Sequence, residues 1–388
     1  MRHFFIYISF TFIVFCGMMS HCYARQTDDF NIEATGESPV HDEAALKVLK
    51  KLQKTYKRGR VLFGQQDALM YGHNWKAEKG EKSFSNCDIQ QITGDMPAVA
   101  GFDIVNVEVG KETNLDGVRF DLMREAIKAH YRKGGIITIS WHANNPVNGG
   151  NVWKVATGER YVEKVLNNKT SHDKYAGWLR KVGDFFDSLR DDKGNLIPVL
   201  FRPYHEYSVG FWWGDKYTSR EEYVALWSRT YDYLVKTRHL TNLIWVYSPY
   251  NAQTEEEFLK FYPGDAYVDI FGFELYASGK KQEDMEESFD RFITKANTGM
   301  AMTARLAAEH NKLSAFCETG LEGMPYAKWW TKALRPVLRK NKCTYVLCWR
   351  NAHQSNSHYY GPFKGAVSER DFKRFARTRQ CLLLDDIN

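Results

Sequence analysis

The stretch IPVLFRPYHE, residues 197–206, is apolar through its first five positions and ends in a histidine and a glutamate. A strand with one wet face alternates apolar and polar residues, whereas a parallel strand covered on both faces is apolar throughout. We therefore expect a buried parallel strand here, with His205 and Glu206 at the carboxyl edge of a sheet.

Runs of the same kind recur along the chain, and the stretches between several of them have helical spacing, as in FDLMREAIKAHYRKG (120–134). The other seven runs are VLFG (61–64), AVAGFDIV (98–105), GIITISWHA (135–143), LIWVYSP (243–249), VDIFGFELY (268–276), SAFCETG (314–320) and CTYVLCWRN (343–351). No glycine-rich dinucleotide turn follows the first. Eight strands alternating with helices predict an α/β fold of the (β/α)8 TIM barrel type rather than an open doubly wound sheet.

The amino terminus, MRHFFIYISFTFIVFCGMMSHCYARQ, has a positive start, an apolar core over residues 4–14 and a small residue, Ala24, before Arg25. This pattern is typical of a secretory signal peptide. We expect a signal peptide over 1–24, a flexible polar lead-in over 25–43 and one catalytic domain over 44–388.

The same segment is a poor membrane anchor, because Ser20, His21 and Cys22 interrupt it before the roughly twenty apolar residues of a span are reached. We expect no integral membrane span and an exported protein, periplasmic or extracellular. A lipid anchor at Cys22 is less favoured, since lipoprotein signals usually carry a small residue where this chain has His21.

The formal net charge of +6 is spread along the chain without a run of five or more like charges, so nucleic acid is not an expected partner. Five cysteines remain after the signal peptide, without a Cys-x-x-Cys pair. An odd number leaves at least one free thiol in an oxidising compartment. We expect a monomer.

In a TIM barrel the chemistry lies at the carboxyl ends of the strands. Glu206 ends the fourth run, and Glu318 ends the seventh. Aromatic residues follow Glu206 at Phe211, Trp212 and Trp213, and an apolar surrounding raises the pKa of a carboxyl group. Two carboxylates that face each other across a barrel mouth suit glycoside hydrolysis, with one as proton donor and the other as nucleophile or base.

Other chemistries fit the residues less well. A metal site would need a tight His and carboxylate cluster, yet His142 and His205 stand on separate strands and no His-x-His or His-Glu-x-x-His occurs. No Gly-x-Ser-x-Gly elbow is present for serine catalysis. We expect no metal and no cofactor. A noncatalytic carbohydrate-binding protein would also present aromatic platforms, but it would not need both carboxylates.

Several motifs carry a family resemblance that extends from about Leu62 to His353. RPYHEYSVGFWWG (202–214) resembles the acid/base motif of glycoside hydrolase family 26, the retaining β-mannanases. The motifs that resemble those of the family's other strands are FGQQDALMYGHNW (63–75), GDMPAVAGFD (94–103), WHANNP (141–146), ETGLEGMPYAKWW (318–330) and CWRNAH (348–353). The chain departs from the family at Gln65, where His is common, and at Glu274, where Asp is frequent.

The resemblance implies hydrolysis of β-1,4-mannosidic linkages in mannan, glucomannan or galactomannan, with retention of configuration. Glu206 would be the general acid and base, and Glu318 the nucleophile. Tyr276 would hydrogen-bond the nucleophile, although it could instead be a strand-end aromatic that caps the core. His205 would contact the sugar beside the cleaved bond, and Trp349 would stack beneath that sugar.

The resemblance also places Arg350 and His142 in the distal wall of the cleft. Asp103 would bind a distal sugar or form a salt-bridged strand end, and of Trp212 and Trp213 we expect one to line the cleft and one to brace Glu206. Endo action and release of mannobiose from chain ends both remain open. Another retaining β-glycanase, acting on xylan or β-glucan, is the rival enzyme; His205, where many related barrels place Asn, favours mannan.

Overall fold

The computed structural model describes residues 38–355 and 357–388. The predicted signal peptide and most of the predicted lead-in lie outside the described residues.

Eight parallel strands form a closed barrel, which confirms the predicted fold. They pair in the order β1, β4, β5, β6, β7, β8, β9 and β10, and β10 pairs again with β1. Their bounds are β1 Val61–Gln66, β4 Val99–Asp103, β5 Ile136–Trp141, β6 Val199–Pro203, β7 Leu243–Tyr247, β8 Ile270–Ala277, β9 Leu313–Leu321 and β10 Tyr345–Cys348. All eight apolar runs of the sequence overlap one of these strands.

Short strands complete the sheet structure outside the barrel. Strand β11, Cys381–Leu382, runs parallel to β1, and β2, Tyr71–Gly72, forms a small antiparallel hairpin with β3, Trp75–Lys76. The hairpin follows β1 directly, at the carboxyl edge of the barrel.

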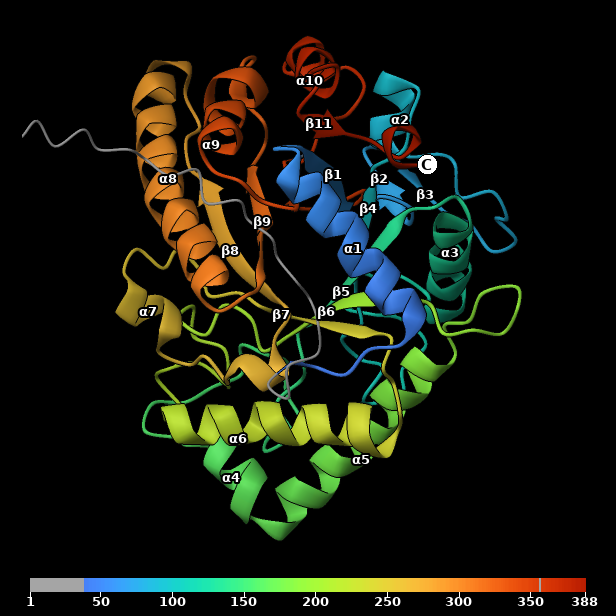
Figure 1. Cartoon of the computed structure of the whole chain (residues 1–388), viewed down its shortest axis with the longest axis vertical. Coiled ribbons are helices and arrows are strands. Elements are labelled where there is room, and N and C mark those ends of the chain that lie inside the picture. Colours follow the sequence, from blue (N-terminus) through green and yellow to red (C-terminus); the bar gives the residue numbers. More distant parts are fainter. Residues whose placement is uncertain (1–37, 356) are drawn as a thin grey trace, which may run out of the picture. The chain divides into compact units, whose positions relative to one another are not determined.

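Helices connect the strands and surround the barrel (Figure 1). Their bounds are α2 Asp88–Thr93, α3 Phe120–Arg132, α4 Tyr161–Asn167, α5 Lys169–Asp187, α6 Arg220–Tyr231, α7 Glu255–Leu259, α8 Met285–Glu309, α9 Arg335–Lys340 and α10 Glu369–Ala376. Two π-helical segments, Asp232–Thr237 and Trp330–Leu334, extend α6 and precede α9, and short 3-10 turns cover Asp265–Tyr267, Gln282–Asp284 and Asp385–Ile387. The helical spacing predicted over 120–134 is confirmed by α3.

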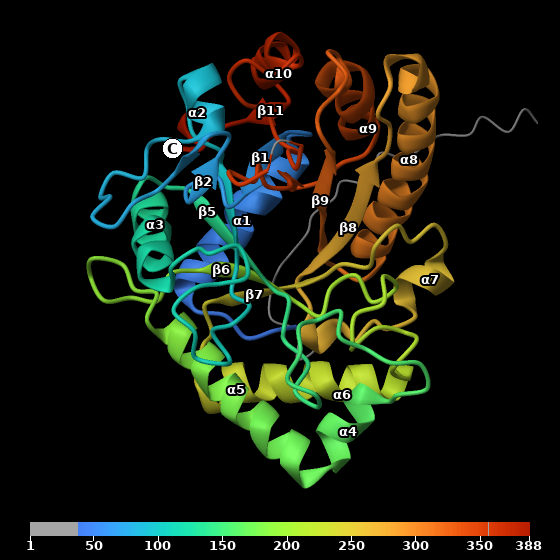
Figure 2. The same ribbon diagram turned by 180° about the vertical axis from the view of Figure 1, so that it is seen from behind.

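Helix α1, Glu43–Lys57, lies across the amino-terminal end of the barrel, in front of the strands in Figure 1 and behind them in Figure 2. Its apolar side chains, Ala45, Leu49 and Leu52, belong to the same buried cluster as strand residues such as Leu200 and Ile270. The interior is therefore sealed at this end, and only the carboxyl end is open to a substrate.

Residues just before α1 are packed on the barrel. The His41 Nε2 atom lies 2.8 Å from Asp269 Oδ1, and the Val40 amide donates to the Tyr231 hydroxyl over 3.1 Å. The packed part of the chain therefore begins earlier than the predicted boundary after residue 43.

All five described cysteines are buried and none forms a disulfide. Burial raises the pKa of the Cys87, Cys317 and Cys343 thiols to about 12, and it raises the pKa of Cys348 and Cys381 as well. They pack as small apolar side chains. Within the described ranges, the helices all fall short of the length and apolarity that crossing a membrane requires.

Candidate active site

A cavity of about 370 Å³ opens at the carboxyl end of the barrel. Both predicted catalytic carboxylates line it, together with five of the residues predicted to bind substrate. The lining residues are Asp103, Val105, Leu115, Asp116, His142, Asn144, Asn151, Val152, Trp153, Glu206, Phe211, Tyr276, Glu318, Trp349, Arg350, His358 and Tyr360. Residues from six of the eight strand ends thus converge on one cleft.

Glu206 follows β6 in a strained backbone conformation, with φ at 53°. Such left-handed geometry is costly for a residue with a side chain and occurs often at active sites. The Glu206 amide donates to the Ser248 carbonyl over 2.9 Å, which holds the turn in place. Burial, reinforced by the charges of Glu274 and Glu318, raises the pKa of Glu206 well above its usual range. A carboxyl group in this state can donate a proton at neutral pH.

Glu318 reaches the cleft because of a β-bulge in β9. Along this strand Ala315 and Cys317 pack inside the barrel and Phe316 packs outside, so regular alternation would turn residue 318 outward. The pairing with β8 shifts between Phe273 and Glu274, so that Cys317 is an extra residue and Glu318 lies opposite Glu274. The bulge therefore turns the Glu318 side chain toward the mouth of the barrel.

Two donors fix the Glu318 carboxylate. One guanidinium nitrogen of Arg202, Nη2, donates to its Oε1 atom, and the Tyr276 hydroxyl donates to Oε2 over 2.7 Å. The other nitrogen of Arg202, Nη1, donates to Glu274 Oε1 over 2.5 Å. The two donors to Glu318 hold its carboxylate in one orientation, as an attacking group requires.

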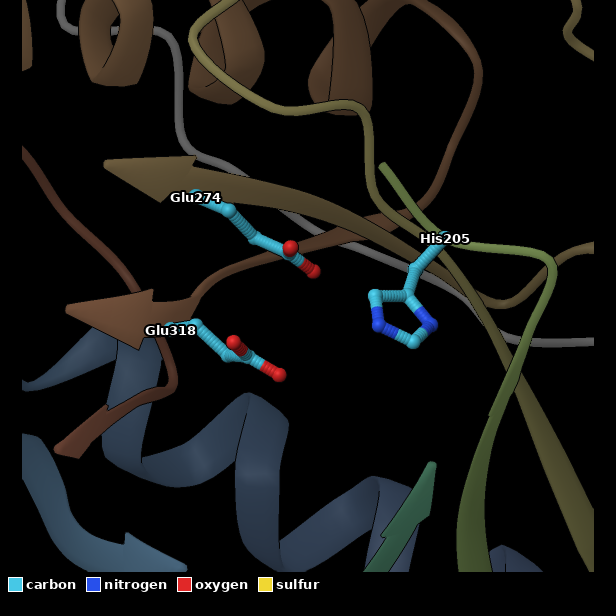
Figure 3. A group of neighbouring side chains, drawn as sticks. All are labelled: His205, Glu274 and Glu318. Atoms are coloured by element: carbon cyan, nitrogen blue, oxygen red, sulfur yellow. The ribbon is translucent and has the colours of Figure 1, made fainter. Parts of the chain in front are cut away.

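His205, Glu274 and Glu318 form a compact group, with one ligand atom from each within 4.8 Å of the others (Figure 3). This spacing could hold a cation, but the Arg202 guanidinium already supplies positive charge to both carboxylates. Arg202 binds both carboxylates, and His205 Nε2 lies 3.0 Å from His142 Nε2. A divalent cation would have to displace the guanidinium charge, so the arrangement suits an ion-paired nucleophile better than a metal site.

Asp103, His142 and His205 form a hydrogen-bonded row along one wall. His142 Nδ1 lies 2.6 Å from Asp103 Oδ2, and Ser140 Oγ donates to the same oxygen over 2.6 Å. Burial lowers the pKa of His205 well below its usual range, and Arg202 and His142 add to that shift. Of the two histidines, the neutral form is favoured for His205 and the charged form for His142, whose pKa is raised.

The profile of glycosyl hydrolase family 26 matches residues 38–331. The chain belongs to this family. A GH26 β-mannanase from Bacteroides ovatus superimposes with a TM-score of 0.81 at 36% sequence identity, over 88% of this chain and 95% of that one.

Two curated family 26 relatives are similar in sequence. A mannan endo-1,4-beta-mannosidase of Bifidobacterium adolescentis is 28% identical over 378 residues, which cover 90% of this chain and 36% of that protein. A mannan endo-1,4-beta-mannosidase of Bacillus subtilis is 35% identical over 204 residues, 48% of this chain and 52% of that protein. The chain spans about half the length, or less, of these relatives.

The two tryptophans of the family 26 motif differ from expectation. Trp212 and Trp213 are both fully buried, and neither lines the cleft. The Nε1 atom of Trp212 donates to the Ala143 carbonyl over 2.9 Å, and that of Trp213 donates to the His205 carbonyl over 2.9 Å. Both brace the strand ends, and Phe211 is the aromatic residue of this stretch that faces the cavity. His205 is also buried and is not one of the residues that line the cavity; its Nε2 atom contacts His142, which does line it.

The two positions at which the chain departs from the usual family 26 pattern are buried. Glu274 is bonded to Arg202 and to the Ser248 hydroxyl, both over 2.5 Å. Gln65 Nε2 donates to the Trp349 carbonyl over 3.4 Å, at the end of the strand that carries Trp349 and Arg350 into the cleft.

Sequence reasoning missed several residues of the cleft. Asp116 pairs with Arg350 over 2.6 Å, and Trp153, 57% exposed, packs edge-on against Phe211 with ring centroids 4.5 Å apart. Arg202 lies inside β6, where it bonds Glu274 and Glu318. A basic residue inside an otherwise apolar strand was a signal, because a buried arginine requires acidic partners.

Proposed function

We propose that the chain hydrolyses β-1,4-mannosidic linkages in mannan, glucomannan or galactomannan by a retaining double displacement. The observation that carries this proposal is the unequal setting of two carboxyl groups in one cleft. The pKa of the half-buried Glu206 is raised, which favours its protonated form, whereas Arg202 and Tyr276 both donate to Glu318. These are the states that a proton donor and a nucleophile require.

In the first step Glu318 attacks the anomeric carbon while Glu206 gives its proton to the departing glycosidic oxygen. The product is a glycosyl ester of Glu318 and a shortened sugar chain. In the second step the Glu206 carboxylate takes a proton from water, which attacks the same carbon and releases Glu318. Two inversions retain the β configuration.

The cleft walls suit a sugar chain. Trp349 and Tyr360 give apolar faces beside the catalytic pair, and Asn144, His142 and Arg350 give hydrogen-bonding groups. Mannan as the substrate class is supported by the relatives, which are named for mannan cleavage, and by the motif His205–Glu206. Asp103 is the hydrogen-bond partner of His142. We therefore assign it the role of a charged strand end that supports the cleft wall.

The decisive experiment follows mannan hydrolysis by proton NMR in the first minutes. We expect the new reducing ends to appear first as the β anomer, because a retaining enzyme preserves configuration. Appearance of the α anomer first would reject the nucleophile role of Glu318. Xylan and mixed-linkage glucan in parallel reactions test the substrate class, and the size of early products separates internal cleavage from release of mannobiose.

We also propose that the protein is exported and acts as a monomer on extracellular or periplasmic mannan. The composition of residues 1–24 supports export. Cell fractionation with an antibody to the catalytic domain, and light scattering of the purified protein, test the two statements separately.

A further inference from the structure

Glu274 is a third carboxyl group at the centre of the site, and it is completely buried. It lies on β8, directly opposite Glu318 on β9. Its Oε1 atom accepts from Arg202 Nη1 and from Ser248 Oγ, each over 2.5 Å. Its Oε2 atom accepts no hydrogen bond from an amide, amine or alcohol among the described residues. A buried carboxylate oxygen without such a donor is costly unless another group supplies a proton.

The carboxyl group of Glu206 lies within hydrogen-bonding reach of Glu274. Two ionised carboxylates in contact repel each other, so the contact is favourable only when one proton lies between them. Arg202 decides which side holds the proton. Because it donates to both Glu274 and Glu318, it stabilises the charge on those two groups, and the proton remains with Glu206.

We propose that Glu274 is a positioning residue for the general acid: it accepts a hydrogen bond from Glu206 and so keeps that carboxyl group protonated and aimed into the cleft. This role rests on the proposed function of Glu206. It gives a role to a buried strand-end carboxylate that neither attacks the sugar nor lines the cleft.

Among the described groups that face Glu274, the cation is Arg202. Burial of Glu274 raises its pKa to about 7, against the opposing charge of Arg202. The other ionisable groups near it are Glu206, Glu318, His205, Tyr223, Tyr250, Tyr276, Tyr345 and Cys317. The lowered pKa of His205 favours its neutral form, and the raised pKa values of the phenols and the thiol keep these groups neutral, so none of them adds a charge near pH 7.

The arrangement also balances charge through the first chemical step. Before it, the group holds one cation, Arg202, and two anions, Glu274 and Glu318. As the Glu206 O–H bond breaks and the ester of Glu318 forms, the group still holds one cation and two anions, now Glu274 and Glu206. The negative charge of Glu318 that helped to keep Glu206 protonated is gone, which prepares Glu206 to act as a base in the second step.

Two variants test the proposal, Glu274→Gln and Glu274→Asp, with Ser248→Ala as the control. Glu274→Gln removes the negative charge that favours protonated Glu206, so the basic limb of kcat/KM against pH on mannotetraose should move down by about one pH unit or more. Glu274→Asp keeps the charge but withdraws it by one methylene, so a smaller shift in the same direction is expected. Ser248→Ala removes a neutral donor to Glu274 and no charge, so it should move the basic limb by less than Glu274→Gln does.

The leaving group gives a second readout. At neutral pH, kcat/KM of Glu274→Gln on mannotetraose should fall at least about tenfold more than on a dinitrophenyl β-mannobioside, which departs without protonation. Equal losses on both substrates would mean that Glu274 only supports the fold or the nucleophile, and would overturn the proposal.

An infrared titration of the resting protein needs no substrate. The carbonyl stretch of a protonated carboxyl group should persist at neutral pH, disappear in Glu206→Gln, and titrate at lower pH in Glu274→Gln. An unchanged midpoint in both Glu274 variants would overturn the proposal. If the midpoint shifts as expected but the wild type cleaves no mannan, the proposed function is wrong and the shared proton stands.

Discussion

The Nδ1 atom of His142 lies 2.6 Å from the Oδ2 atom of Asp103, and this contact sets the charge of the cleft wall. Burial alone would lower the pKa of His142, but the charge and hydrogen bond of Asp103 outweigh it and raise the pKa. For Asp103 burial would raise the pKa, yet donation from His142, Ser140 and Val105 lowers it. Each group thus favours the charged form of the other.

The raised pKa of His142 predicts a pH-dependent stability. A histidine whose pKa rises on folding stabilises the protein fully below its unfolded pKa of about 6.5, and that contribution is lost as pH rises through the folded pKa. We expect Asp103→Asn to lower the free energy of unfolding by about 1–3 kcal/mol near pH 6, and by less at pH 9. Urea unfolding at both pH values measures the difference. Asp121→Asn, which breaks an exposed pair with Arg119, should have little effect at either pH.

Chemical rescue separates the two catalytic carboxylates. Glu318→Ala should abolish turnover of every β-mannoside, whereas Glu206→Ala should show a burst of phenol from an aryl mannobioside and then slow turnover, with mannan hydrolysis reduced about 10²–10⁴-fold. Azide needs no general base, so it should accelerate Glu206→Ala and give a β-mannosyl azide. A β-azide from Glu318→Ala, with no burst and no β-azide from Glu206→Ala, would show that the roles are reversed.

Trp213 should matter for the placement of the acid, although it does not touch the cleft. Trp213→Phe keeps an aromatic ring but removes the hydrogen bond to the His205 carbonyl, which is buried next to Glu206. We expect a loss of about 1–3 kcal/mol in unfolding free energy, from the unpaired carbonyl. We also expect a lower kcat with little change in KM, because the change acts on Glu206 rather than on sugar binding. A raised KM at constant kcat would instead place Trp213 in substrate contact.

Trp153 should contribute to binding rather than to chemistry. Its ring is largely exposed at the edge of the cleft and is supported by Phe211, so it can cover the apolar face of a sugar. Trp153→Ala should raise KM for long manno-oligosaccharides several-fold, in line with about 0.5–1.5 kcal/mol for an aromatic contact, and leave kcat nearly unchanged. Val367→Ala, an exposed apolar residue that does not line the cavity, is the matched control and should leave KM unchanged.

The barrel could be predicted because a strand that is buried on both faces is apolar at most of its positions. Each strand of the barrel overlaps a run of the sequence, and most of these runs are too uniformly apolar for a half-exposed sheet. Short runs such as VLFG suffice because β1 is buried along its whole length. The carboxyl-end rule then places Glu206, Glu318 and Tyr276 at the same opening, where the structure has them.

Details of the site depend on geometry that composition does not encode. The bulge at Cys317 reverses the side-chain alternation of β9, and nothing in SAFCETG distinguishes a bulged strand from a regular one. Trp212 and Trp213 are equally apolar whether they face a sugar or a packed wall, so their burial could not be read from the motif. The double contact of Arg202 requires the spacing of β8 and β9, which only the closed barrel supplies.

The five buried thiols have a practical consequence for handling the protein. A thiol reagent attacks thiolates, and burial keeps all five both inaccessible and protonated in the folded state. The domain should therefore fold and remain active in reductant, without any oxidase or isomerase. Thiol labelling can also measure local opening of the fold. The rate at which a reagent labels Cys87 beside α2, or Cys348 at the end of β10, reports how often that part of the barrel opens.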